Sequence, residues 1–186
     1  LDAQDQILAA PDYEDHIYEQ SDADYRKARD PFALTGSPLL PQGLNLGRQL
    51  HYLQHRRPEL YARCARVLLY PQYWAWLLSG VAASEVTSLG CHTDLWLPAA
   101  GEFSPMARRF GWNVLLPPLQ AAGARLGPIL PSIARRTGLD SACTVVCGIH
   151  DSNASYLSHL AGRATYDPFA VISSGTWVIV MAQGTD

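Results

Sequence analysis

Cys147-Gly-Ile-His-Asp-Ser152 marks the point where a predicted apolar strand, 142–147, gives way to a histidine and a carboxylate. Ligands of α/β proteins usually bind beyond the carboxyl ends of strands, which is where His150 and Asp151 fall. Further along, Val171-Ile-Ser-Ser-Gly-Thr-Trp-Val-Ile-Val180 reads as two apolar strands joined by a tight glycine turn. A carboxylate at a strand end can take a proton from a hydroxyl, and such a turn can offer N–H groups to phosphate oxygens. Together the two stretches indicate half of a phosphoryl-transfer site.

Helical and strand patterns alternate along the rest of the chain. Leu46, Leu50 and Leu53 recur at three- to four-residue spacing, which predicts a helix over 44–55. Other helices are expected at 22–29, from 58 onward, at 72–78, 102–110, 131–138 and 152–160. Strands are expected at 66–70, at 142–147 and as a pair around Ser174. Helices that outnumber strands, with short connections between them, indicate an α/β fold.

Composition limits the classes of partner. With 186 residues and 48% hydrophobic residues, the chain can bury the core of one domain, or of one domain and a piece of another. The balance of 14 basic against 17 acidic side chains gives no positive field for nucleic acid or an anionic membrane. No run of 18 apolar residues and no cleavable leader is found, so we expect a cytoplasmic protein without a membrane partner.

The four cysteines, Cys64, Cys91, Cys143 and Cys147, lack paired CxxC spacing and sit among apolar neighbours. We therefore expect buried, reduced thiols. On one strand Cys143 and Cys147 would be about 13 Å apart. That separation is too large for a shared metal or a disulfide. The sequence therefore gives no support for a zinc site, and no metal-ligating residue is assigned.

Two further expectations concern side chains. Trp74 and Trp76 lie on an apolar helix and are expected in the core rather than in a sugar-stacking platform. The stretch 85–97 is rich in Thr, Ser, Gly and His, which suits a surface near a polar ligand.

Five motifs occur in a definite order along the chain. They are Tyr13-Glu-Asp15, the run from Pro58-Glu-Leu60 to Leu77-Leu-Ser-Gly80, Glu85-Val-Thr-Ser-Leu-Gly-Cys-His-Thr-Asp-Leu95, Gly148-Ile-His-Asp-Ser152 and Ser173-Ser-Gly-Thr-Trp177. In this order they resemble the FGGY family of carbohydrate kinases, most nearly its rhamnulokinase and fuculokinase branch. The resemblance spans nearly all of the chain.

The resemblance implies a ribonuclease-H-like (actin-like ATPase) fold of two domains that flank a cleft. Residues 1–165 would be part of the N-terminal sugar-binding domain, and residues 166–186 the first strands of the C-terminal ATP-binding domain. The family's phosphate-binding hairpin is expected upstream of Leu1 and its adenosine-binding glycine motif downstream of Asp186. The chain is therefore expected to be a piece of a kinase of several hundred residues, inactive by itself.

The resemblance also assigns roles in ATP- and Mg²⁺-dependent phosphorylation of a sugar hydroxyl. Asp151 would be the general base, while His150, Asp151 and Ser152 contact the sugar. Gly175 and Thr176 would bind nucleotide phosphate. Structural alternatives stay open for each: Asp151 could cap the following helix, His150 could be a structural histidine, and the glycine turn could be an ordinary hairpin.

Two other function classes share features with this sequence. A non-catalytic sugar-binding or scaffolding domain is the main alternative. A hydrolase using His150, Asp151 and Ser155 is discounted because the chain lacks a G-x-S-x-G elbow. His16 and Ile17 follow Asp15 where the family commonly carries an Arg, so the sequence does not identify the sugar. Expected partners are a small sugar and ATP, without nucleic acid or membrane, and a homodimer is allowed for.

Overall fold

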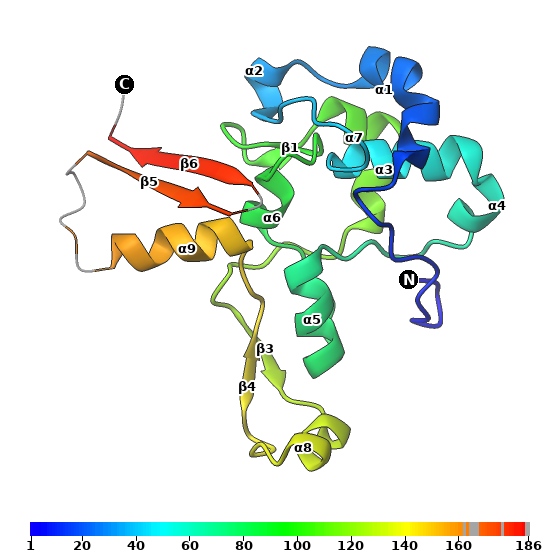
Figure 1. Cartoon of the computed structure of the whole chain (residues 1–186). Coiled ribbons are helices and arrows are strands. Elements are labelled where there is room, and N and C mark those ends of the chain that lie inside the picture. Colours follow the sequence, from blue (N-terminus) through cyan, green and yellow to red (C-terminus); the bar gives the residue numbers. More distant parts are fainter. Residues whose placement is uncertain (162, 164–167, 176, 185–186) are drawn as a thin grey trace. The chain divides into compact units, whose positions relative to one another are not determined.

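The chain forms two compact units, Leu1–Gly148 and Ile149–Asp186 (Figure 1). The computed structural model describes residues 1–161, 163, 168–175 and 177–184. The domain boundary expected after residue 165 remains a prediction.

Short helices dominate the first unit. They are η1 (His16–Ser21), α1 (Asp22–Ala28), α2 (Phe32–Thr35), α3 (Leu46–Arg56), α4 (Pro58–Tyr61), α5 (Tyr70–Ser79), α6 (Val86–Gly90), α7 (Pro105–Arg109), η2 (Trp112–Leu115) and α8 (Pro131–Thr137). The strands pair antiparallel, two by two: β1 (Trp96–Leu97) with β2 (Glu102–Phe103), and β3 (Arg125–Pro128) with β4 (Thr144–Val146).

Local sequence explains where several helices begin and end. The Ser104 side chain accepts the Ala107 N–H at 3.1 Å and so starts α7. Gly80 and Gly138 end α5 and α8 at φ values of 77° and 76°, a conformation that glycine adopts without strain. Both glycine stops are confirmed predictions.

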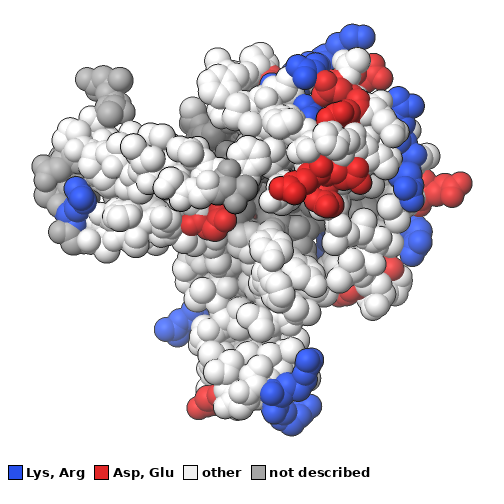
Figure 2. Space-filling model, viewed as in Figure 1, with Lys and Arg blue, Asp and Glu red and all other residues white. Residues whose placement is uncertain are grey.

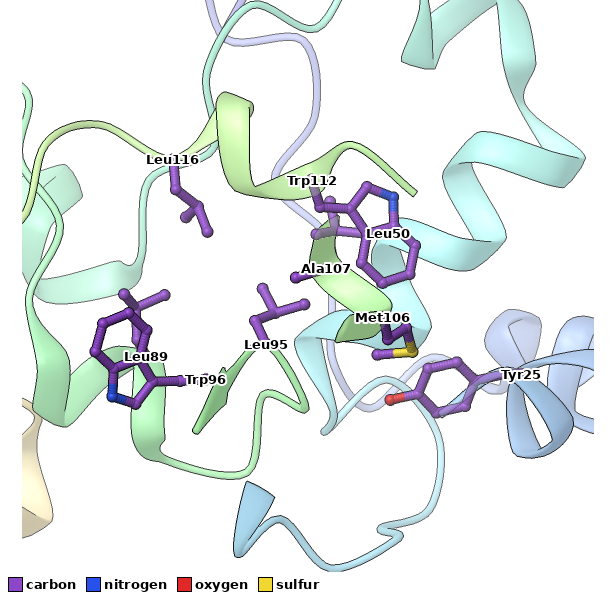
Figure 3. Packing of buried hydrophobic residues seen from close by; sticks show 9 residues of the cluster. All are labelled: Tyr25, Leu50, Leu89, Leu95, Trp96, Met106, Ala107, Trp112 and Leu116. Atoms are coloured by element: carbon purple, nitrogen blue, oxygen red, sulfur yellow. The ribbon is translucent and has the colours of Figure 1, made fainter. Parts of the chain in front are cut away.

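The main hydrophobic core of the first unit is built from separate elements of the chain. Figure 3 shows its buried members: Tyr25, Leu50, Leu89, Leu95, Trp96, Met106, Ala107, Trp112 and Leu116. The indole N–H of Trp112 donates to Gln54 Oε1 at 2.8 Å, so this large ring is buried without losing a hydrogen bond. A smaller cluster of Ala75, Ile129, Ala134 and Val145 packs α5 and α8 against the antiparallel pair β3–β4.

The second unit places a helix against a hairpin. It contains α9 (Asp151–Leu160), β5 (Phe169–Ser174) and β6 (Val178–Gln183), and the two strands pair antiparallel along their whole length. Tyr156 of α9 stacks on Phe169 of β5 at a centroid distance of 5.5 Å. The predicted helix at 152–160 and the strand pair around Ser174 are confirmed, the helix beginning one residue earlier.

Two predicted elements were wrong in whole or in part. Residues 66–70 form no strand: the Val67 N–H donates to Leu115 O at 2.8 Å, and Tyr70 already begins α5 because Pro71 favours a first helical turn. The helix expected at 102–110 is split, since β2 precedes α7 and the Ser104 cap fixes the start of the helix.

Two burial expectations were also wrong in part. Only Cys147 of the four free cysteines is buried; Cys143 is exposed because it lies just outside the short strand β4. Trp74 is 46% exposed, since α5 turns Ala75 rather than Trp74 toward the smaller core cluster.

The stretch 85–97 was expected at a surface near a polar ligand, but much of it is buried. Asp94 is fully buried and its carboxylate accepts two guanidinium N–H bonds from Arg29, the shorter at 2.7 Å, and one from the Tyr25 hydroxyl. Burial, followed by the charge of Asp94, raises the pKa of Tyr25 well above its usual value. For Arg29, burial alone would lower the pKa, but the hydrogen bond and charge of Asp94 raise it. The polar residues here serve internal contacts.

None of the described helices is long and apolar enough to cross a membrane.

Candidate active site

The backbone after β4 is held in place up to the point where the candidate residues begin. The N–H groups of Cys147 and Gly148 donate to Ala124 O and Ala122 O, each at 3.0 Å, and so extend the pairing beyond β4. Gly148 has a φ of 88°, and an added Cβ would lie 3.5 Å from Pro71. A side chain at this position would be strained, so glycine permits the sharp bend that precedes His150.

Asp151 is the first residue of α9, and its side chain is 92% exposed. Its Oδ1 accepts the Ser152 N–H at 2.6 Å and lies 3.2 Å from His150 Nδ1. Its Oδ2 accepts no hydrogen bond from the described residues. Because N–H groups at a helix start favour negative charge, the geometry supports a helix-stabilising role for one oxygen while the other stays open to a ligand.

His150 and Ser152 flank this carboxylate. His150 occupies the N-cap position of α9 without a side-chain cap bond, and its side chain is 22% exposed. The Ser152 hydroxyl lies 3.4 Å from Asp151 Oδ1. The three residues predicted to contact a sugar therefore cluster around a single carboxylate oxygen, as their adjacency in sequence requires.

The glycine turn lies between β5 and β6. The Gly175 N–H donates to Trp177 O at 3.1 Å, and an added Cβ at Gly175 would meet nothing within 4 Å. The backbone is therefore open to close approach from outside. Thr176, the other predicted nucleotide contact, lies outside the described residues.

Within the second unit, the direction of the elements brings the two predicted halves of the site to one end. In Figure 1 the chain runs out along α9 and returns along β5, so the start of α9 and the β5–β6 turn lie at the same end of this unit. By contrast, no hydrogen bond among the described residues joins the Ser155 side chain to His150 or Asp151. The hydrolase alternative receives no support from this arrangement.

Comparison with known proteins gives the family. No family model matches the chain. The crystal structure of a carbohydrate kinase from Novosphingobium aromaticivorans superposes with a TM-score of 0.85 at 51% sequence identity, covering 94% of this chain and 38% of that one. The chain belongs to the FGGY family of carbohydrate kinases.

Two curated relatives of the chain are also sugar kinases. The FGGY chain is 27% identical over 137 residues to the L-fuculokinase of Haemophilus influenzae, covering 73% of this chain and 28% of that protein. It is 30% identical over 152 residues to the L-xylulose/3-keto-L-gulonate kinase of Escherichia coli, covering 76% of this chain and 29% of that protein. The chain thus spans less than a third of these two relatives.

The predicted fold class is confirmed. The solved relatives have the α/β, ribonuclease-H-like fold of actin-like ATPases, of which this FGGY chain carries a part.

Proposed function

We propose that the protein containing this chain phosphorylates a sugar hydroxyl with ATP, and that Asp151 is the general base. One observation supports this most directly: the exposed Asp151 carboxylate keeps Oδ2 free of described partners at the end of the unit that also carries the Gly175 turn. A general base must reach the proton that it removes, and a free, solvent-facing oxygen can do so.

The neighbouring residues would orient the sugar. His150 can donate and accept hydrogen bonds through its two ring nitrogens, and the Ser152 hydroxyl can do both. Acting beside Asp151, they would hold the acceptor hydroxyl near the base. Such positioning is the main protein contribution in phosphoryl transfer, since the transition state requires alignment and charge stabilisation rather than new covalent chemistry.

The nucleotide side of the proposal rests on Gly175 and Thr176. The open space beside Gly175 would let a phosphate come close to the turn backbone, and the Thr176 hydroxyl would add a donor. Mg²⁺ would balance charge on the transferring phosphoryl group. The division into a sugar-binding part, 1–165, and the first strands of an ATP-binding part, 166–186, belongs to the same proposal.

The proposed substrate class is a ketose or a related polyol. The names of the two curated relatives, an L-fuculokinase and an L-xylulose kinase, support a small sugar substrate. We further propose a cytoplasmic enzyme without nucleic-acid or membrane partners, with a homodimer as the assembly to be checked by light scattering.

The test is an ADP-release assay with the full-length protein, ATP, Mg²⁺ and a panel of ketoses and polyols. Sugar-dependent ADP release with at least one compound is the expected result, while the 186-residue chain alone should give none. Saturable sugar binding by the full-length protein without any ADP release would instead favour a non-catalytic sugar-binding domain.

A further inference from the structure

A hollow lies at the corner between α3 and α4, within the first unit. Its volume is about 460 Å³, within the range of about 300–1,000 Å³ typical of small-molecule sites. It is lined by Arg56, Arg57, Pro58, Glu59, Leu60 and Arg63. Along the edge of the view where α1, α3 and α4 lie in Figure 1, Figure 2 shows several basic side chains with acidic ones among them. The lining therefore carries three positive charges and one negative charge.

Two of these arginines have uncommitted side chains. The side chains of Arg57 and Arg63 are exposed. Their guanidinium groups form no hydrogen bond or ion pair with the described residues. Arg56 donates one N–H to a backbone oxygen at 3.0 Å. Elsewhere on the surface, Arg108 is paired with Glu102 at 2.8 Å. The hollow thus collects guanidinium groups whose donors are largely available.

Glu59 is not paired with any of these arginines. It shares the hollow with the arginines but forms no ion pair within 4.0 Å with any described basic group. An anion in the hollow would consequently meet several guanidinium groups at the cost of one like charge. Pro58 and Leu60 add apolar surface for a part of the ligand that carries no charge.

We propose that this hollow binds the phosphate group of a small phosphorylated compound. The planar guanidinium fork matches two phosphate oxygens at once, which makes arginine well suited to phosphate recognition. The hollow is larger than a phosphate ion needs, and its apolar lining would contact the attached organic group. None of the lining residues is among those proposed for catalysis, so the proposal does not depend on their role.

The test titrates the full-length protein with inorganic phosphate at low ionic strength, followed by calorimetry. Wild-type protein should show saturable binding that weakens as salt rises, because salt screens the attraction between solvent-exposed charges. The double substitution Arg57→Ala and Arg63→Ala should weaken this binding about tenfold, which corresponds to about 1.4 kcal/mol. Phosphate held at the proposed nucleotide site would persist in every variant, so differences between variants isolate this hollow.

Two matched variants sharpen the result. Glu59→Gln removes the like charge without removing volume and should tighten phosphate binding, which also decides the matter if the double variant does not fold. Arg135→Ala with Arg136→Ala makes the same charge change on the exposed face of α8 and should leave binding unchanged. Absent binding, equal weakening in both double variants, or weaker binding in Glu59→Gln would each overturn the proposal.

Discussion

Asp94 and Asp151 both carry a carboxylate, yet their surroundings are opposite. Asp94 is fully buried, and Arg29 and Tyr25 occupy both of its oxygens. Asp151 is almost fully exposed, and only one of its oxygens has partners among the described residues. The first carboxylate is committed to contacts within the first unit, whereas the second keeps one oxygen without a described partner. The two aspartates are chemically the same and differ in whether one carboxylate oxygen is left without a described partner.

The largest expected effect falls on the exposed carboxylate. Asp151→Asn in the full-length enzyme should lower turnover by about two to four powers of ten, the usual contribution of a general base. Sugar affinity should change little, because the amide keeps the shape of the side chain. Steady-state kinetics with the best sugar from the panel measures both. Unchanged turnover would reduce Asp151 to a helix-stabilising residue.

The same substitution at the buried carboxylate should act on stability instead. Asp94→Asn should lower the free energy of unfolding by about 3–5 kcal/mol, because it leaves the largely buried Arg29 guanidinium without its counter-charge. Urea unfolding of both variants gives the comparison, with Asp151→Asn as the matched control, expected within about 0.5 kcal/mol of wild type. If the two variants had similar free energies of unfolding, the buried carboxylate would contribute no more to stability than the exposed one.

Acid should also destabilise the first unit through a buried histidine, His51. Burial, with a smaller contribution from the charge of His55, lowers the pKa of His51 to about 4 from an ordinary value of 6.5. The folded state thus favours neutral His51. Its contribution to stability is complete above pH 6.5, and it declines as the pH falls from 6.5 toward 4.

Measuring unfolding free energy against pH tests this contribution. The slope due to His51 should approach about 1.4 kcal/mol per pH unit within that window. His51→Phe should remove this part of the slope, while His159→Gln on the exposed face of α9 should not. If the plots of unfolding free energy against pH ran parallel for wild type and His51→Phe, His51 would not be the source of this slope.

The smallest effect on stability is expected at the open turn. Gly175→Ala should change the free energy of unfolding by less than about 0.5 kcal/mol, because the added methyl group meets nothing within 4 Å. The KM for ATP should nevertheless rise, since the methyl group would obstruct close approach of phosphate. An unaltered KM would favour the ordinary hairpin turn over a nucleotide contact.

Much of the local structure was predictable from the sequence. The glycine stops at Gly80 and Gly138, the helix after His150 and the hairpin around Gly175 were all expected, because each depends on a few neighbouring residues. The family also followed from the order of motifs. The false strand at 66–70 shows the limit of this approach: an apolar run predicts a strand only if a partner strand lies beside it, and none does among the described residues.

Tertiary structure alone decided what each polar or aromatic group does. Tyr25 and Asp94 are 69 positions apart, and no pattern within either segment predicts that they share a buried hydrogen bond. Likewise, the exposure of Trp74 depends on how α5 packs against the smaller core cluster. The sequence by itself determined the local conformations and the family, since these depend on short-range sterics and on residue order. The packing of distant segments decided which charges are committed inside the protein and which remain available to a ligand.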